Sequence, residues 1–106
     1  MTMPTQDRRD LLTVVAYMKA APGRRDELRT ELEKLIAPTS QEAGYVNYDL
    51  HQGTEDPDTF ILYENWESDA ALDAHLATPH LVHFAEIMSG LLDENGLTIN
   101  RLQRIA

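Results

Sequence analysis

The sequence predicts one α+β domain in which four strands and two helices alternate as β-α-β-β-α-β. Three observations predict this class. The chain has 106 residues, a length that suits a single domain. Its hydrophobic and charged fractions, 42% and 25%, are those of a globular rather than a disordered protein. Apolar residues recur in turn at the spacing of a strand and at the spacing of a helix.

The first strand and helix are predicted from residues 11 to 38. Residues 11–18 are mostly aliphatic and β-branched, which favours a strand, and Pro22 and Gly23 form a turn after it. A helix follows, because one apolar stripe recurs at helical spacing, made of Leu28, Leu32, Leu35 and Ile36. Pro38 is expected to weaken or end this helix, since proline lacks the backbone N–H.

A β-hairpin is predicted next. Gly44 opens a strand at residues 45–52, and the turn-rich residues 53–58 join it to a further strand at 59–66. Because the connection is short, the two strands are expected to pair antiparallel.

The second helical region is expected to be broken in two. Ser68 can cap a helix over residues 69–77, because its hydroxyl can accept a backbone N–H. Thr78 followed by Pro79 repeats a capping residue before a proline at the first helical position. A second, short helix is therefore expected to run from there to about Leu91.

The chain is expected to close with a loop at residues 93–96 and a last strand at 97–105. This order is the ferredoxin-like split βαβ arrangement, with the helices on one face of a four-stranded antiparallel sheet. Residues 1–10 are polar and predicted to be a flexible N-terminal tail, and residues 11–106 to be a single domain.

Both faces of the predicted sheet are apolar. One side of the first and third strands carries Leu12, Val14, Ala16, Met18, Phe60, Leu62 and Trp66. The opposite side carries Leu11, Val15, Tyr17, Ile61 and Tyr63. A sheet with one wet face should alternate apolar and polar residues, so the second face needs a cover. The chain has no further element to supply one, and we expect a homodimer.

Composition excludes several classes of function. The net charge of -9 argues against nucleic-acid binding, which usually needs a basic surface. No apolar run reaches the length of a membrane span, and the N-terminus has no apolar signal segment. The absence of cysteine excludes disulfides, thiolate metal sites and a cysteine nucleophile. A reducing cytoplasm is the simplest location for such a chain.

Three features of the second half of the chain are distinctive: Tyr-Glu-Asn-Trp at residues 63–66, Ala-Leu-Asp-Ala-His-Leu-Ala-Thr-Pro-His at residues 71–80, and Phe84. In these features the sequence resembles the antibiotic biosynthesis monooxygenase (ABM) domain family. The proline-glycine turn before the first helix and residues 48–52 support the resemblance, which extends from about residue 11 to 105. It implies a dimeric α+β barrel in which two ferredoxin-like sheets face each other. Family members include cofactor-independent monooxygenases of anthrones and quinols, haem-degrading enzymes and an isomerase.

The resemblance argues against haem degradation. In this chain, Ala16 stands where the haem-degrading branch carries an asparagine, and His75 stands where it carries a tryptophan. The iron-ligating histidine of that branch would fall near Ala85. Alanine cannot ligate iron. Occupation of the tryptophan position by His75 still implies that this residue lines the cavity.

Three residues are candidates for catalytic proton transfer. Imidazole titrates near neutral pH, and His75 and His80 flank the helix break, so both could point to one pocket mouth. Glu64 shares a strand face with apolar residues, and burial there would raise its pKa to that of a useful general base. An ion pair of Glu64 with Arg101, and packed or capping roles for the histidines, are the structural alternatives. His75 is predicted to be an exposed helix residue, whose replacement by alanine should change stability by less than about 0.5 kcal/mol.

Other residues are candidates for substrate binding. His51, Trp66, Tyr63 and Phe84 are the expected substrate contacts, and Tyr17, Asn47 and Tyr48 could donate hydrogen bonds. A metal site at His80, His83 and Glu86 is an alternative that lacks a clear further ligand. The sequence has no phosphate-binding loop or nucleophile elbow, and we predict neither metal nor cofactor.

The function predicted by these features and the resemblance is cofactor-independent oxidation of a quinol-like or polyphenolic small aromatic by O2. The physical basis is that a deprotonated, electron-rich ring can reduce oxygen directly in a dry pocket. A small-molecule-binding protein or an isomerase on the same dimeric fold is the alternative.

Overall fold

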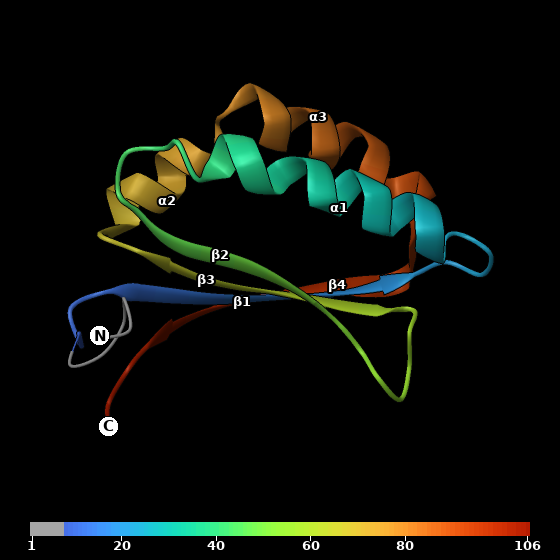
Figure 1. The fold of residues 1–106 in the computed structure, drawn as a ribbon, viewed down its shortest axis with the longest axis horizontal. Coiled ribbons are helices and arrows are strands. Elements are labelled where there is room, and N and C mark those ends of the chain that lie inside the picture. The colour runs from blue at the N-terminus through green and yellow to red at the C-terminus, as the bar shows by residue number, and fades with distance from the viewer. Residues whose placement is uncertain (1–7) are drawn as a thin grey trace.

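The computed structural model describes residues 8–106; residues 1–7 of the expected tail lie outside the described residues. Its elements are, in chain order, β1 (Leu12–Ala20), α1 (Arg25–Thr39), β2 (Tyr45–Gln52), β3 (Thr59–Trp66), α2 (Asp69–Leu76), α3 (Pro79–Ile87), the 3-10 turn η1 (Met88–Gly90) and β4 (Leu92–Gln103). The strands form one sheet in the order β2-β3-β1-β4, and all neighbouring strands are antiparallel. All three α-helices cover the same face of that sheet (Figure 1). This confirms the predicted ferredoxin-like α+β fold.

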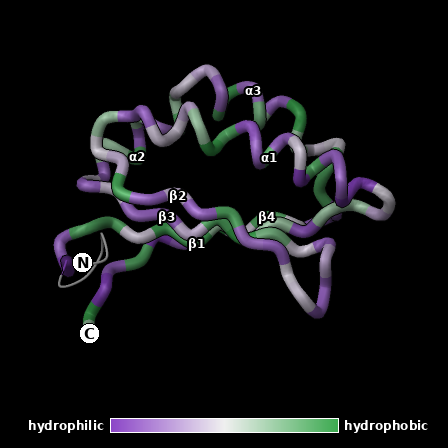
Figure 2. Tube along the Cα trace, viewed as in Figure 1, coloured by the Kyte–Doolittle hydropathy of each residue, from purple (hydrophilic) through white to green (hydrophobic). Residues whose placement is uncertain are grey.

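The core lies between the helices and the sheet, where hydrophobic segments of both layers face each other (Figure 2). The α1 stripe is buried at Leu28, Leu32 and Leu35, and the helix continues one residue past Pro38 to Thr39. From the sheet, alternate residues of β1 and β3 enter the core: Val14, Ala16, Met18, Ala20, Phe60, Leu62 and Trp66. The polar Glu64 belongs to the same row and is 4% exposed.

The break between α2 and α3 forms as expected, although its capping differs. Ser68 accepts a hydrogen bond from the backbone N–H of Ala71, which confirms the predicted cap of α2. Thr78 stands at the N-cap of α3, with Pro79 at the first position. Its hydroxyl, however, donates to the carbonyl of His75 at 2.7 Å and therefore ties the two helices together across the break.

The last strand begins earlier than the sequence suggested. Residues 93–96, expected to be a loop, lie inside β4, which starts at Leu92. Asn95 has a left-handed φ of 59°, and the pairing of β1 with β4 is irregular between Met18 and Ala20. Leu92 is aligned with Ala20 and Leu97 with Met18, so the turn-forming residues 93–96 make an irregularity between two paired parts of one strand.

The connection between α1 and β2 lies close against α2. Gly44 has a φ of 81°, a conformation that favours glycine, and a Cβ at this position would clash with Ala71. Glycine therefore allows the 40–44 segment to approach α2, and this approach places Glu42 beside the histidines described below.

The other face of the sheet carries Val15, Tyr17, Ile61 and Tyr63, and no element among residues 8–106 covers it. Tyr63 is 36% exposed there. None of the helices in the described part of the chain is long and apolar enough to cross a membrane.

Candidate active site

A cavity of about 200 Å³ lies between the sheet and helices α2 and α3. Most of its wall is aliphatic or aromatic, with contributions from Val14, Ala16, Met18, Leu62, Leu72, Phe84, Met88 and Leu97. The exposed residues Leu76, Ala85 and Ile99 also line it and mark its opening to solvent. The three positions that the resemblance identified, Ala16, His75 and Ala85, all line this cavity.

Glu64 is the acidic side chain in the cavity wall. Its Oε1 accepts a hydrogen bond from the indole Nε1 of Trp66 at 3.0 Å. Burial raises the pKa of Glu64 to about 7, and the negative charge of Glu42 adds to this effect, whereas the Trp66 hydrogen bond opposes it. Near neutral pH this carboxyl group is therefore divided between its acid and base forms.

His75 forms part of the cavity wall near Glu64. Contrary to the expectation of an exposed helix residue, it is 1% exposed, because α2 turns this side of the helix towards the sheet. Its ring lies 4.5 Å from that of Trp66 and 5.2 Å from that of Tyr48, measured between ring centroids. Removal of this side chain would therefore leave a hole in the core.

The hydrogen bonds of His75 determine which nitrogen carries its proton. Nδ1 lies 2.9 and 3.1 Å from the two carboxylate oxygens of Glu42, and an ionised carboxylate can only accept. Burial lowers the pKa of His75, and the hydrogen bond and charge of Glu42 oppose this, so the neutral ring carries its proton on Nδ1. Nε2 has no hydrogen-bond partner among residues 8–106 and keeps its lone pair for a ligand.

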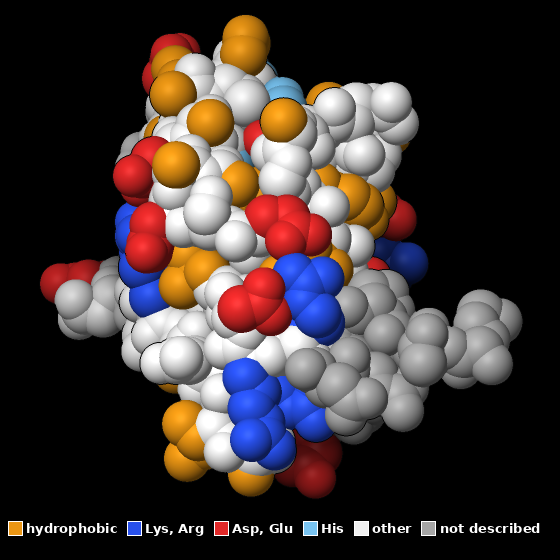
Figure 3. All heavy atoms as spheres, turned by 90° about the vertical axis from the view of Figure 1, so that its left-hand side faces the viewer, with side chains coloured by type: hydrophobic (Ala, Val, Ile, Leu, Met, Phe, Trp, Pro, Cys, Tyr) orange, Lys and Arg blue, Asp and Glu red, His pale blue; other side chains and the backbone are white. Residues whose placement is uncertain are grey.

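His80 meets the same carboxylate from the outer side. Its Nε2 lies 2.9 Å from Glu42 Oε2 and 3.3 Å from the hydroxyl oxygens of Thr39 and Thr78. The side chain is 21% exposed, and histidine atoms reach the surface at this end of the molecule (Figure 3). The helix break thus brings His75 and His80 together as predicted, but only His75 lines the cavity.

Glu42, Tyr48 and Arg101 are site residues that sequence reasoning missed or did not single out. Glu42 lies in a connecting segment with no periodicity, so no sequence pattern marks it. Tyr48 pairs with Glu64 across β2 and β3, lines the cavity and is 3% exposed. Burial raises the pKa of its phenol, which therefore stays a hydrogen-bond donor.

Arg101 does not form the alternative ion pair with Glu64. Both residues are aligned with Val14, on opposite sides of β1, and both line the cavity. The guanidinium of Arg101 instead lies 3.5 Å from Asp69 and 3.5 Å from Asp73 on α2. It therefore provides positive charge at the cavity edge, and Glu64 has no cationic partner among residues 8–106.

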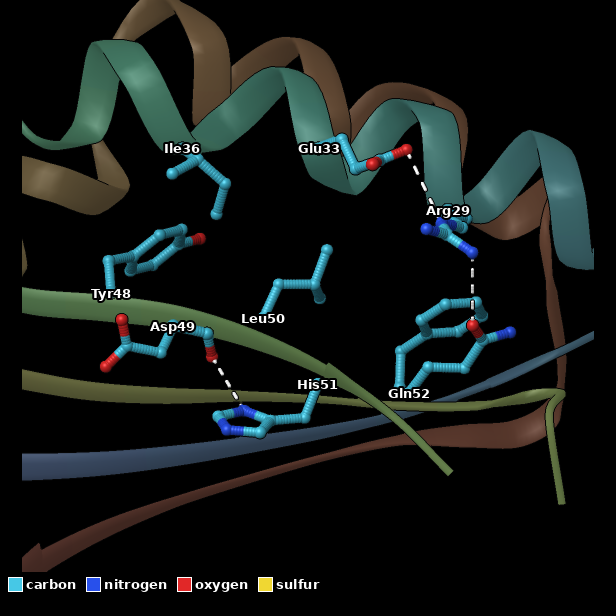
Figure 4. Close-up of a pocket in the computed structure, with 9 residues that line it drawn as sticks. Arg29, Glu33, Ile36, Tyr48, Asp49, Leu50, His51 and Gln52 are labelled. Atoms are coloured by element: carbon cyan, nitrogen blue, oxygen red, sulfur yellow. Dashed lines mark hydrogen bonds and ion pairs between the residues drawn. The ribbon is translucent and has the colours of Figure 1, made fainter. Parts of the chain in front are cut away.

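Of the four expected substrate contacts, Phe84 lines the cavity. Trp66 lies behind the cavity wall and donates a hydrogen bond to Glu64, which lines it. Tyr63 and His51 lie on the opposite face of the sheet. In Figure 4, Tyr48 points towards α1 while His51 points away from it. Tyr48 and His51 both line a second, more open cavity of about 470 Å³ beside β2 and α1. Arg29, Glu33, Leu50 and Gln52 line it as well. Tyr17 and Asn47 also belong to the opposite face.

The expected alternative metal cluster does not form. His83 and Glu86 are exposed on α3, and their ligand atoms do not gather with that of His80 into one group. Within residues 8–106, the set of histidine and acidic side chains close enough to hold a metal ion is Glu42, His75 and His80.

Comparison with known proteins identifies relatives across nearly the whole chain. The family model for antibiotic biosynthesis monooxygenase matches residues 11–87. A protein of Escherichia coli K12 named "Probable quinol monooxygenase YgiN" is 31% identical over 99 residues, covering 84% of this chain and 95% of that protein. The crystal structure of PA3566 from Pseudomonas aeruginosa is 40% identical, with a TM-score of 0.86, and covers 92% of this chain and 96% of that one. A crystal structure titled antibiotic biosynthesis monooxygenase is 27% identical, with a TM-score of 0.83, covering 90% of this chain and 99% of that one.

Proposed function

Since this chain belongs to the antibiotic biosynthesis monooxygenase family, we propose that it oxidises a quinol-like or polyphenolic aromatic with O2, without a cofactor. One observation carries the proposal: a largely apolar cavity that contains a carboxyl with a pKa of about 7 and a buried histidine held by a second carboxylate. The name of the YgiN relative supports a quinol as the class of substrate.

The cavity suits a small aromatic ring. Its volume of about 200 Å³ lies below the roughly 300–1,000 Å³ of most ligand pockets, so it favours a substrate of one or two rings. Leu62, Leu72 and Phe84 would contact the ring faces and edges. Tyr48 and Arg101 would stabilise an oxygen that becomes negative, by a hydrogen bond and by positive charge.

His75 would act as the base. Glu42 accepts the Nδ1 proton, which leaves the Nε2 lone pair to take a proton from a ring hydroxyl. Glu42 would also stabilise the imidazolium that forms. His80 would not touch the substrate, because it lies on the far side of Glu42.

The oxidation then needs no external reductant. The quinol anion passes one electron to O2, and the resulting radical pair combines at a ring carbon to give a hydroperoxide. The proton that His75 took would return to the peroxide oxygen, and neutral His75 would then take the proton of the oxygenated ring carbon, so that C=O forms as the O–O bond breaks. Glu64, partly protonated near pH 7, would supply the proton with which the outer oxygen leaves as water. One quinol and one O2 give one hydroxylated quinone and one water, which balances atoms and electrons.

Oxygen uptake with a panel of quinols tests the function. We expect one O2 consumed per quinol, one atom of ¹⁸O from labelled O2 in the product, and full activity in the presence of EDTA. The control is the autoxidation rate of each quinol without protein. Turnover without oxygen would instead favour the isomerase alternative, and binding without turnover the small-molecule binder.

We further propose that the uncovered sheet face, with Val15, Tyr17, Ile61 and Tyr63, forms a homodimer interface. A stable interface of this kind should bury on the order of 1,500 Å² or more in total. Sedimentation should give twice the 12.0 kDa mass of one chain, and Val15→Lys should give a monomer. A wild-type protein that stays monomeric at micromolar concentration would contradict the interface.

A further inference from the structure

The cluster of Glu42, His75 and His80 has the composition and spacing of a metal site. One carboxylate oxygen and one nitrogen from each ring all lie within 4.8 Å of one another. Glu42 Oε2 is 2.9 Å from both His75 Nδ1 and His80 Nε2, so both rings direct these nitrogens at one point. From this geometry we propose that the cluster binds a divalent transition metal of the zinc class, and that the bound metal switches off His75 as a base.

The donor set selects the class of metal. Two imidazoles and one carboxylate suit Zn²⁺ and its neighbours in the first transition series, whereas Mg²⁺ and Ca²⁺ prefer oxygen donors throughout. Zinc bonds of about 2.0–2.2 Å are shorter than the 2.9 Å between Oε2 and each ring nitrogen, so the ion would lie between the two nitrogens, on the side that faces Glu42. The Glu42 side chain would therefore have to withdraw by about 1 Å, given bonds of that length.

The rings are held in place from several directions. The Thr78 hydroxyl donates to the carbonyl of His75 across the helix break, which keeps α2 and α3 together. Trp66 and Tyr48 pack against the His75 ring. The hydroxyl oxygens of Thr39 and Thr78, each 3.3 Å from His80 Nε2, could hold a water molecule as a fourth ligand.

A metal ion can reach the cluster from solvent without passing through the cavity. The side chains of His80 and Glu42 are 21% and 12% exposed, whereas that of His75 is 2% exposed. The ion would enter beside His80 and bind Nδ1 of His75, the ring nitrogen that faces Glu42. The net charge of the chain, -9, favours the approach of a cation.

Metal binding and the cavity are coupled through the His75 ring. A metal ion on Nδ1 requires the lone pair of that nitrogen, so the single proton of the neutral ring must move to Nε2. Nε2 then becomes a donor and can no longer accept a proton from a substrate hydroxyl. This consequence for catalysis rests on the proposed function, whereas metal binding itself does not.

Zinc titration of the tag-free protein in competition with a chromophoric chelator tests the site. We expect one Zn²⁺ per chain. His80→Ala and Glu42→Gln should each weaken binding by at least the roughly 10–100-fold that loss of a metal site's supporting residue costs. His83→Ala is the matched control, because this histidine is exposed on the same helix as His80 and lies outside the cluster. It should bind zinc like the wild type.

Nitrogen NMR of the histidine rings adds a readout that needs no substrate. Zinc should move the His75 proton from Nδ1 to Nε2 in the wild type and in His83→Ala, but not in His80→Ala. Absence of stoichiometric binding, or an equal loss in His83→Ala and His80→Ala, would overturn the site. Binding without the proton shift would overturn the switch. If quinols are not oxidised at all, the binding and NMR results stand independently; if they are, zinc should inhibit the wild type.

Discussion

Replacing His75 by asparagine is expected to lower the turnover number for quinol oxidation by a factor of about 10²–10⁴, the usual cost of losing a general base. The asparagine amide can still donate to Glu42, as Nδ1 does now, but it has no basic atom at the position of Nε2. Asparagine is therefore a cleaner test than alanine, which would also leave Glu42 without its inner partner.

The buried position of His75 means that stability must be measured beside activity. Because the ring is packed against Trp66 and Tyr48, we expect His75→Asn to cost about 1–3 kcal/mol of unfolding free energy. His83→Asn is the matched control, since His83 is exposed on α3 and does not line the cavity, so this variant should lose neither activity nor stability. A folded His75→Asn protein with wild-type kinetics would remove His75 from the mechanism.

Replacing Glu64 by glutamine is expected to have two large and opposite effects. Turnover should fall by about 10²-fold or more, because glutamine cannot supply or accept the proton at the cavity wall. Stability above pH 7 should rise. The glutamine Oε1 can still accept the Trp66 indole N–H, while the cost of an ionised group in an apolar wall disappears.

The size and pH range of the stability effect follow from the pKa of Glu64. Burial raises it from the ordinary 4.5 to about 7, so between these values the folded protein binds more protons at this site than the unfolded chain does. The contribution of Glu64 to stability therefore falls as the pH rises from about 4.5 to about 7, by about 3 kcal/mol in all. Glu64→Gln should remove this loss.

Urea unfolding at pH 4.5 and pH 8 checks the prediction, with both proteins at the same concentration because a dimer's stability depends on it. The variant should gain up to about 3 kcal/mol over the wild type at pH 8 relative to pH 4.5. Glu86→Gln is a control, since Glu86 is an exposed acid on α3 that makes no ion pair among residues 8–106. An equal gain in both variants would mean that net charge, and not burial of Glu64, sets the effect.

The local sequence was enough to predict most of the fold. The hairpin strands at residues 45–52 and 59–66 match their predicted bounds, because turn-forming residues mark where each begins or ends. The break at Thr78-Pro79 was predictable from the geometry of proline at a helix start. Alternation in β3 likewise placed Glu64 on the core side, since side chains of a strand point to opposite faces in turn.

The same local signals misjudged the end of the chain. Asn95 and Gly96 are turn-forming residues, and the sequence alone predicts a loop there. Pairing with β1 on both sides of these residues decides otherwise, because Leu92 is aligned with Ala20 and Leu97 with Met18, and β4 therefore begins at Leu92. Sequence periodicity contains no information about how long a neighbouring strand continues.

By itself, the sequence determined the element order, the two-sided apolar sheet, the family and three of the polar groups near the cavity: Glu64, His75 and His80. Only the tertiary structure decided what these groups do. It brings Glu42 from an irregular connection to the space between two rings 33 and 38 residues away, and so assigns the proton of His75 to Nδ1. It also separates His51 and Tyr63 from the cavity by the thickness of the sheet. The physical reason is that periodicity encodes which side of an element is buried, whereas hydrogen-bond partners depend on distances between elements, which the packing of the core sets.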